Sequence, residues 1–145
     1  MRGIRSFLVN NFKTFNGQHW FSFKDLNILT GPNNSGKSSF IQALKLFAEG
    51  FRSGDFPKLD LQQGKENFGD YKNVINSEAK ENRFGFGFIL HHEELDKDLR
   101  VEYLFSDGKS EYSGSAIFYS LEIKDDDDVF IGIYDHYEIE NTPFK

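Results

Sequence analysis

The sequence contains no cysteine and no long apolar segment. Without thiols the chain forms neither a disulfide nor a thiolate metal site. Its first residues lack an apolar run of signal-peptide length, and no stretch approaches the roughly 20 apolar residues that span a membrane. These absences exclude a disulfide-stapled secreted fold and a helical membrane protein. They predict a soluble, cytoplasmic chain with no membrane partner.

Basic residues are outnumbered, and the charge is unevenly placed. The net charge is −6, from 17 basic and 23 acidic residues. Residues 1–92 hold 12 basic and 8 acidic side chains, whereas residues 93–145 hold 5 and 15. The acidic half would repel a nucleic-acid backbone at close range. The chain alone is therefore predicted to bind DNA poorly, and nucleic acid is a partner only for a larger assembly.

Phenylalanine is the residue present in excess, with 17 copies among 145 residues. A chain of this length suits one ordinary domain with one core. So many rings are not tolerated at a solvated surface, so they must fill that core or mark a surface for a missing partner.

The strongest motif spans residues 31–39, which match the phosphate-binding loop pattern G-x-x-x-x-G-K-[ST] without a gap. Residues 26–30 before it read as a short buried strand, and residues 37–51 after it as a helix. Strand and helix in register with the motif disfavour a chance glycine-rich turn. The predicted nucleotide-binding residues are Asn33, Asn34, Ser35, Gly36, Lys37, Ser38 and Ser39.

Two side chains of the motif have predicted roles. Lys37 would reach the β- and γ-phosphates as a point charge, and the Ser38 hydroxyl would complete the coordination of Mg²⁺. The chain has no Asn-Lys-x-Asp guanine signature, which favours ATP over GTP. The helix that follows is predicted to pack on a sheet through Phe40, Leu44, Phe47 and Phe51, widened by Ile41 and Ala48.

The rest of the chain reads as strands around one irregular region. Strands are predicted over 4–10 and 19–23, with a two-residue turn at Asn16-Gly17, and a loop region over 52–82 with a short helix at 70–76. Four alternating runs then predict an antiparallel meander within 83–140. The runs place on one face Phe84, Phe86, Phe88 and Leu90; Val101, Tyr103 and Phe105; Ile117, Tyr119, Leu121 and Ile123; and Val129, Ile131 and Ile133. Residues 141–145 are predicted to be a truncated end.

Residues 4–51 resemble the start of an ABC-type ATPase head. The likeness rests on a strand, Asn-Phe-Lys-Thr-Phe at 11–15, a second strand, and Asp-Leu-Asn-Ile-Leu at 25–29 before the phosphate loop. This is the pattern of the SMC, RecF and OLD-nuclease branch, which includes AAA-labelled ATPases of bacterial defence systems. The resemblance implies an α/β P-loop NTPase fold of ABC type, with the N-terminal lobe only.

The resemblance also suggests further site residues. By position it places Lys13 and Thr14 near the phosphates or the sugar, although Lys13 could be an ordinary solvated turn lysine. Gln62 and Gln63 invite comparison with the glutamine that contacts Mg²⁺ in ABC proteins, but their spacing is not diagnostic.

Several parts of an ABC ATPase are missing from the sequence. Residues 129–135 resemble a Walker B strand ending in Asp135, but position 136 is His and not the second acid, so a sheet strand is favoured. Ser113-Gly114-Ser115 is the nearest match to a signature segment, and it leads into a strand. No catalytic residue is predicted, and the expected partner is a C-terminal lobe of the same ATPase or a second head in a dimer.

Two functions therefore stay open. The first is a Mg-ATP-binding lobe that is incompetent for hydrolysis alone. The second is a non-hydrolysing module, ordered by nucleotide, that docks a partner nuclease or effector subunit. The acidic run 125–128 and the segment 91–94 are predicted to be a solvated turn and a strand end, not metal sites, because neither has the ligand spacing of a metal site.

Overall fold

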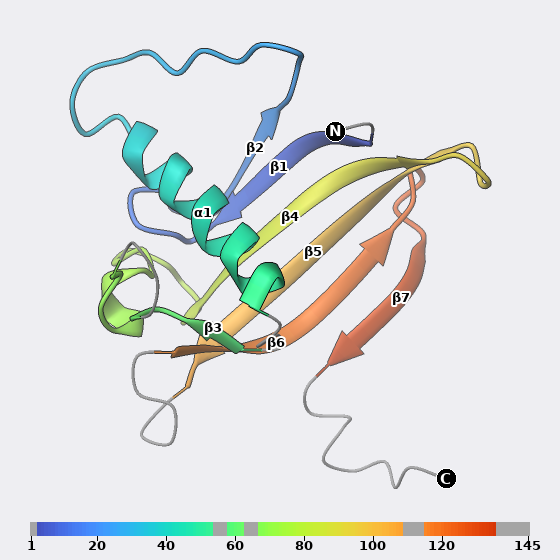
Figure 1. The fold of residues 1–145 in the computed structure, drawn as a ribbon. Helices are drawn as coiled ribbons and strands as arrows, with labels where there is room; N and C mark the ends of the chain where they lie inside the picture. The colour runs from blue at the N-terminus through green and yellow to red at the C-terminus, as the bar shows by residue number, and fades with distance from the viewer. Residues whose placement is uncertain (1–2, 54–57, 63–66, 109–114, 136–145) are drawn as a thin grey trace, which may run out of the picture.

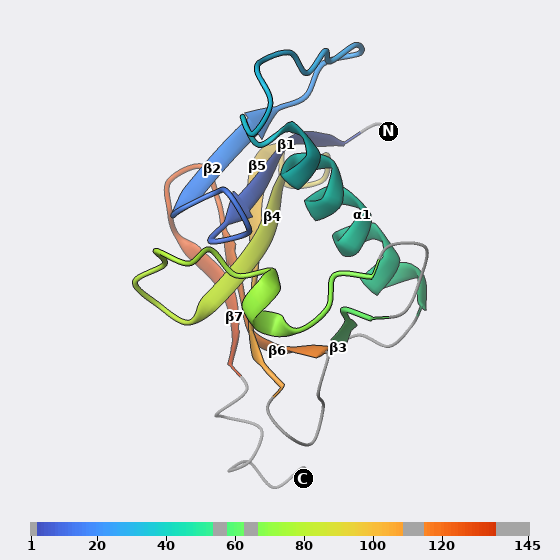
Figure 2. The same cartoon turned by 90° about the vertical axis from the view of Figure 1, so that its left-hand side faces the viewer.

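The computed structural model describes residues 3–53, 58–62, 67–108 and 115–135. Their strands form one sheet, and helix α1 (Lys37–Ser53) crosses one face of it (Figure 1). Figure 2 shows α1 standing off this face when the sheet is seen from the side. The strands are β1 (Ile4–Asn10), β2 (Gln18–Ser22), β3 (Lys58–Asp60), β4 (Arg83–His92), β5 (Lys97–Asp107), β6 (Ser115–Lys124) and β7 (Phe130–Asp135). A 3-10 helix, η1 (Tyr71–Asn73), lies between β3 and β4.

The described sheet is antiparallel throughout. Its order is β2-β1-β4-β5-β6-β3, and β7 also pairs with β6. The predicted meander is confirmed as β4 to β7, and the strand predicted at 129–135 is confirmed as β7. β3 and β7 pair with different ends of β6, at residues 115–117 and 120–124. The described residues therefore form a mixed domain of the α+β kind, with one helix on an antiparallel sheet, and the strand-helix alternation of an α/β fold is not seen in them.

Aromatic rings fill the space between α1 and the sheet. The ring of Phe86 is fully buried, and its centroid lies 5.4 Å from Phe12, 5.8 Å from Phe47 and 6.0 Å from Phe7. Each such pair contributes about 0.5–1.5 kcal/mol beyond the burial of its area. The buried phenylalanines are Phe7, Phe12, Phe40, Phe68, Phe84, Phe86, Phe105 and Phe118. The excess of phenylalanine thus supplies much of the core.

The face that α1 buries differs in part from the predicted one. The helix begins at Lys37, as predicted, and ends at Ser53. Its buried residues are Ser39, Phe40, Ala43, Leu46 and Gly50, with Leu44 and Phe47 packed against them. The prediction that Ile41 and Ala48 widen this face is wrong, because both are exposed. Phe51 is also 47% exposed.

A glycine explains how α1 is turned on the sheet. A Cβ added to Gly50 would overlap the side chain of Leu59 in β3. The helix therefore approaches β3 through its small residue, and Leu59 is fully buried beneath it. β3 itself falls in the region 52–82 that was predicted to be loop.

Residues 26–30, predicted as a buried strand, are not a strand in the structure. Their apolar side chains are 77%, 75% and 42% exposed, in the order Leu26, Ile28 and Leu29. The segment arches away from the sheet (Figure 1), so no described strand lies beside it to accept its backbone hydrogen bonds. The prediction of a strand here is therefore wrong for this chain as it stands.

The connection between β1 and β2 is a loop over residues 11–17. The backbone N–H of Asn11 donates to the Gly17 carbonyl at 3.2 Å, and the Gly17 N–H donates to the Asn11 side chain at 2.8 Å. Asn11 adopts a φ of 51°, which asparagine tolerates better than most residues. The predicted two-residue turn at Asn16-Gly17 is thus wrong.

The short helix predicted at 70–76 is confirmed only over residues 71–73, as the 3-10 helix η1, and Tyr71 ties it to the sheet. The Tyr71 hydroxyl lies 3.1 Å from the carbonyl oxygens of Asn82 and Phe105. Burial raises the pKa of this hydroxyl far above its usual range, so it stays protonated and donates.

A bulge in β6 changes which of its side chains face the core. The pairing register with β5 shifts between Leu104 and Phe105. Phe118 is buried in the core, whereas Tyr119 lies under the guanidinium of Arg83, 3.8 Å from its ring centroid. The predicted shared face of Tyr119 with Leu121 is therefore wrong, because the bulge breaks the alternation.

Candidate nucleotide-binding site

The phosphate loop is curled where its motif predicts a curl. Three of its residues have positive φ: Gly31 at 142°, Asn34 at 66° and Gly36 at 90°. Glycine adopts such angles freely, and asparagine does so at a small cost. The Ser35 N–H donates to the Pro32 carbonyl at 3.3 Å, which closes the loop before α1 begins.

The loop rests on the turn between β1 and β2. A Cβ added to Gly36 would lie 3.0 Å from Cζ of Phe15 and 3.2 Å from the hydroxyl oxygen of Thr14. The φ of 90° favours glycine at this position, and the space for a side chain there is also tight. Thr14, a predicted site residue, is brought against the loop. Sequence reasoning missed Phe15, which the second glycine of the motif faces directly.

The Lys37 ammonium lies inside the loop. It donates to the Gly31 carbonyl at 2.7 Å, to the Pro32 carbonyl at 2.6 Å and to the Ser35 hydroxyl at 3.1 Å. These neutral oxygens solvate the charge, and an anionic phosphate oxygen is a stronger acceptor. Lys37 is therefore held where a phosphate bound by the loop would meet it.

The two serines after Lys37 face different surroundings. Ser38 is exposed at the start of α1, whereas Ser39 is 8% exposed and packs in the helix interface. The first N–H groups of a helix have no partner within it, and they carry the positive end of its dipole. Of the two hydroxyls, that of Ser38 is the one open to a metal ion beside a bound phosphate. Asn33 and Asn34 are also exposed at the loop.

Lys13 is held firmly by its backbone. Its N–H donates to the Val74 carbonyl at 2.7 Å, and its φ is 48°. Its ammonium lies 5.2 Å from the centroid of the Phe68 ring. The side chain is thus directed toward the segment before η1, and its contact with nucleotide stays a prediction.

The other residues compared with ATPase motifs are spread over the fold. The Gln62 amide donates to the Asp70 carboxylate at 3.4 Å, and Gln63 lies outside the described residues. Asp135 is the last residue of β7, opposite Ser120 of β6. His136 and the Ser113-Gly114 pair lie outside the described residues.

The acidic turn at 125–128 is organised by its own hydrogen bonds. One carboxylate oxygen of Asp125 accepts the N–H groups of Asp127 and Val129, each at 3.0 Å, and the other lies 2.9 Å from the Lys97 ammonium. These bonds, that from Lys97 first, lower the pKa of Asp125, and the same pair raises the pKa of Lys97. Within the described ranges no group of three or more acidic or histidine side chains could hold a metal ion, the segment 91–94 included.

No helix in the described part of the chain is long and apolar enough to cross a membrane. Charges from the basic and the acidic parts of the sequence meet in the fold, since the Arg5 guanidinium lies 2.7 Å from the Asp98 carboxylate.

Comparison with known proteins identifies relatives of the loop and its domain. A family model described as "AAA domain, putative AbiEii toxin, Type IV TA system" matches residues 26–143. The chain is 38% identical over 71 residues to the chromosome condensation protein dpy-27 of Caenorhabditis elegans, which covers 48% of this chain and 5% of that protein. It is 46% identical over 41 residues to an ATP/GTP phosphatase of Helicobacter pylori, which covers 28% of this chain and 11% of that one. The chain thus corresponds to a small part of the length of these curated relatives.

Proposed function

The chain belongs to the AbiEii-type AAA domain family of P-loop ATPases, and from this premise we propose that it binds ATP with Mg²⁺ on residues 31–39. The observation that carries the proposal is the Lys37 ammonium, held inside a curled loop by three oxygen acceptors. The name of the Helicobacter relative, an ATP/GTP phosphatase, supports a nucleotide as the ligand.

The residues present fit a polyphosphate. The loop is exposed, two glycines shape it, and Lys37 with the first N–H groups of α1 supplies positive charge. Ser38 would hold Mg²⁺, and Thr14 would border the bound phosphates. The ion would neutralise phosphate charge.

Binding of Mg-ATP is expected to raise the melting temperature. A ligand that binds only the native state at a hundredfold excess over its Kd adds about 2.7 kcal/mol, or roughly 5–10 °C for a chain of this size. Differential scanning fluorimetry with Mg-ATP, Mg-GTP and Mg²⁺ alone measures it. A folded sample that shows no shift with millimolar Mg-ATP would overturn the proposal.

We further propose that the chain is the N-terminal lobe of an ABC-type ATPase of the SMC, RecF and OLD-nuclease branch. The resemblance over residues 4–51 supports this assignment, and so does the 38% sequence identity over 71 residues to a chromosome condensation protein. In this proposal a C-terminal lobe or a second head supplies the residues that polarise water. The chain alone should then release phosphate at background rate.

A steady-state phosphate-release assay tests this expectation. Wild type, Lys37→Ala and Asp135→Asn should all give background rates. Turnover in the wild type that is lost in both variants would show that Asp135 acts as a Walker B acid. In that case the chain would be an ATPase by itself, and the proposal of a lobe that only binds nucleotide would be wrong.

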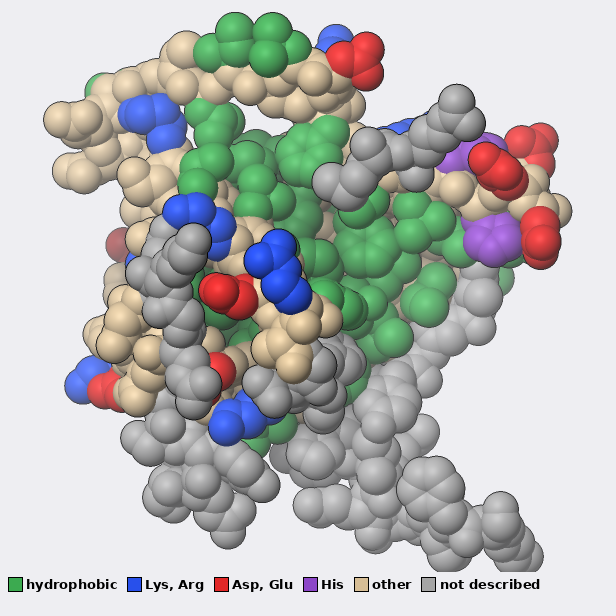
Figure 3. All heavy atoms as spheres, in the orientation of Figure 1, with side chains coloured by type: hydrophobic (Ala, Val, Ile, Leu, Met, Phe, Trp, Pro, Cys, Tyr) green, Lys and Arg blue, Asp and Glu red, His purple; other side chains and the backbone are tan. Residues whose placement is uncertain are grey.

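One observation favours the second function, an interaction module ordered by nucleotide. Leu26 and Ile28 are exposed, and Figure 3 shows hydrophobic side chains gathered beside α1, over β4 and β5. Phe51 of α1 is 47% exposed as well, and its ring centroid lies 5.5 Å from that of Tyr103. Exposed apolar surface of this kind supports the proposal of a protein interface. The partner would be a C-terminal lobe, a second head, or a nuclease or effector subunit.

The isolated chain is therefore expected to self-associate. Light scattering should show species larger than a monomer, and replacing both Leu26 and Ile28 by serine should shift the distribution toward monomer. Replacing the exposed polar residues Lys72 and Lys80 by serine is the control. A wild type that stays monomeric at high concentration and does not bind a hydrophobic dye would contradict an uncovered interface.

A further inference from the structure

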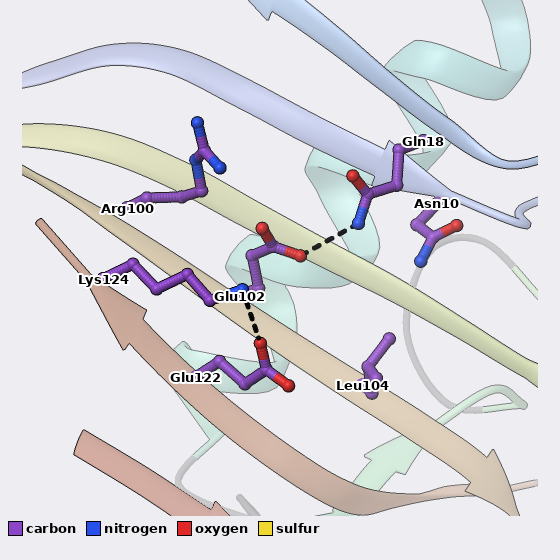
Figure 4. A pocket seen from close by; sticks show the side chains of 7 residues that line it. All are labelled: Asn10, Gln18, Arg100, Glu102, Leu104, Glu122 and Lys124. Carbon is purple, nitrogen blue, oxygen red and sulfur yellow. Dashed lines mark hydrogen bonds and ion pairs between the residues drawn. The ribbon is translucent and has the colours of Figure 1, made fainter. Parts of the chain in front are cut away.

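A polar hollow lies on the face of the sheet that points away from α1 (Figure 4). Its volume is about 210 Å³, below the range of roughly 300–1,000 Å³ that encloses a whole drug-sized ligand. Two carboxylates, Glu102 and Glu122, line it together with two cations, Arg100 and Lys124. The hollow is therefore sized for one polar group and not for a nucleotide.

Gly85 and Gly87 of β4 lie beside β5 on this face of the sheet. A Cβ on Gly87 would lie 2.6 Å from the Val101 carbonyl oxygen and 3.3 Å from Cγ of Glu102. A Cβ on Gly85 would lie 2.5 Å from the Tyr103 carbonyl oxygen. Because these positions carry no side chain, the Glu102 side chain packs against β4, and its carboxylate is partly shielded from solvent.

The sheet curls toward the hollow. The Gln18 amide of β2 donates to the Glu102 carboxylate of β5 at 3.1 Å, although β1 and β4 lie between these strands. The guanidinium of Arg100 likewise reaches back to within 5.5 Å of the Trp20 ring centroid. Two bridges over the intervening strands make this face concave.

The cations around the hollow have charged partners, whereas the Glu102 carboxylate accepts a hydrogen bond from a neutral group. The Arg100 guanidinium lies 3.2 Å from the Asp128 carboxylate, and the Lys124 ammonium lies 3.1 Å from that of Glu122. Each cation thus has a carboxylate partner. Among the described residues, the hydrogen-bond donor to Glu102 is the neutral amide of Gln18.

Burial raises the pKa of Glu102 even though Lys124 and Arg100 act to lower it. The groups that face this carboxylate are Lys124 and Glu122 from β6, Arg100 from its own strand, Gln18 from β2 and Asn10 from the end of β1. Although two cations lie near Glu102, no charged side chain among the described residues donates a hydrogen bond to its carboxylate. A weakly hydrated planar cation would supply donors to both carboxylate oxygens.

We propose that this hollow binds a guanidinium group through Glu102, with the Asn10 and Gln18 amides beside it. The group comes from a free small molecule or from an arginine side chain of a partner protein. The site lies on the opposite face of the sheet from α1, so it does not depend on the proposed nucleotide site.

The test is an NMR titration of the full chain with methylguanidinium chloride, against sodium chloride at equal ionic strength. Amide shifts should move at Asn10, Gln18 and Glu102, and Glu102→Gln should weaken binding at least tenfold. Glu94→Gln, which removes an exposed acid at the far end of the β4–β5 hairpin, should leave binding unchanged. Equal binding by wild type and Glu102→Gln, or tighter binding of inorganic phosphate than of methylguanidinium, would overturn the proposal.

A measurement on the unmodified protein gives a second test. The cation binds the ionised carboxylate, so its affinity should rise with pH through the pKa of Glu102 and then level off. By linkage, saturating methylguanidinium should lower that pKa, as followed by the side-chain carboxyl carbon. A pH-independent affinity would contradict a role for Glu102. A pentapeptide with a central arginine that binds at least tenfold more tightly would identify a partner protein as the source, whereas equal affinity would identify a free small molecule.

Discussion

Lys37→Ala is expected to remove about half or more of the rise in melting temperature that Mg-ATP produces. The substitution deletes the one ammonium that lies inside the phosphate loop and leaves the loop backbone in place. A charge-assisted contact to phosphate contributes about 1.5–3 kcal/mol, so affinity should fall by one to two orders of magnitude. Scanning fluorimetry at a fixed concentration of Mg-ATP measures the loss.

Lys45→Ala is the matched control for this prediction. Lys45 is an exposed lysine two turns further along the same helix, and its loss changes the net charge by the same amount. It should leave the ATP-dependent shift intact. If the two variants lose the shift equally, general electrostatic attraction and not the loop accounts for the stabilisation.

Phe86→Ala should lower the free energy of unfolding by about 3–5 kcal/mol, because it opens a cavity in a fully buried site. Phe86 contacts rings from β1, α1 and the turn after β1, so the cavity would lie where these elements meet. Domains of this size have only about 5–15 kcal/mol in total. Urea denaturation with a shared m-value gives the difference.

The control is Phe51→Ala, which removes the same ring from a site that is 47% exposed. Its ring packs on those of Phe47 and Tyr103 at the edge of the core. A loss well below that of Phe86→Ala is expected. If both variants lose a similar free energy of unfolding, burial of the Phe86 ring does not explain its contribution to stability.

The elements that could be predicted from sequence are those fixed by local periodicity. Alternating apolar residues from Phe84 onward specify strands, and short polar connections specify antiparallel pairing. The prediction of a meander is therefore confirmed. The start of α1 followed from the motif itself. Periodicity did not show the bulge at Tyr119, because an extra residue in a strand leaves no mark in composition.

Elements that depend on distant partners could not be predicted. Residues 26–30 have the composition of a buried strand, yet backbone hydrogen bonding needs a neighbour that the described residues do not supply. The buried face of α1 also depends on Gly50 meeting Leu59, a contact between the helix and β3. Helical spacing alone therefore assigned Ile41 and Ala48 to the wrong side.

For the candidate site, the motif predicted the curled backbone and the place of Lys37. It could not show which residues support the loop, because Thr14 and Phe15 are far from it in sequence. The signal was the second glycine of the motif, which indicates a close neighbour without naming it. The direction of the Lys13 side chain toward Phe68 had no local signal at all.

The support of Gly36 by the turn after β1 bears on how the loop acquires its shape during folding. That turn is itself tied to the segment before β4: Lys13 donates to Val74, and the Asn76 N–H donates to the Asn11 carbonyl at 2.8 Å. Three stretches distant along the chain must therefore assemble before Gly36 has its neighbours, and closures of this length form slowly. A peptide of residues 26–51 would carry the whole motif without its platform. Affinity for nucleotide should emerge late in refolding, together with the sheet.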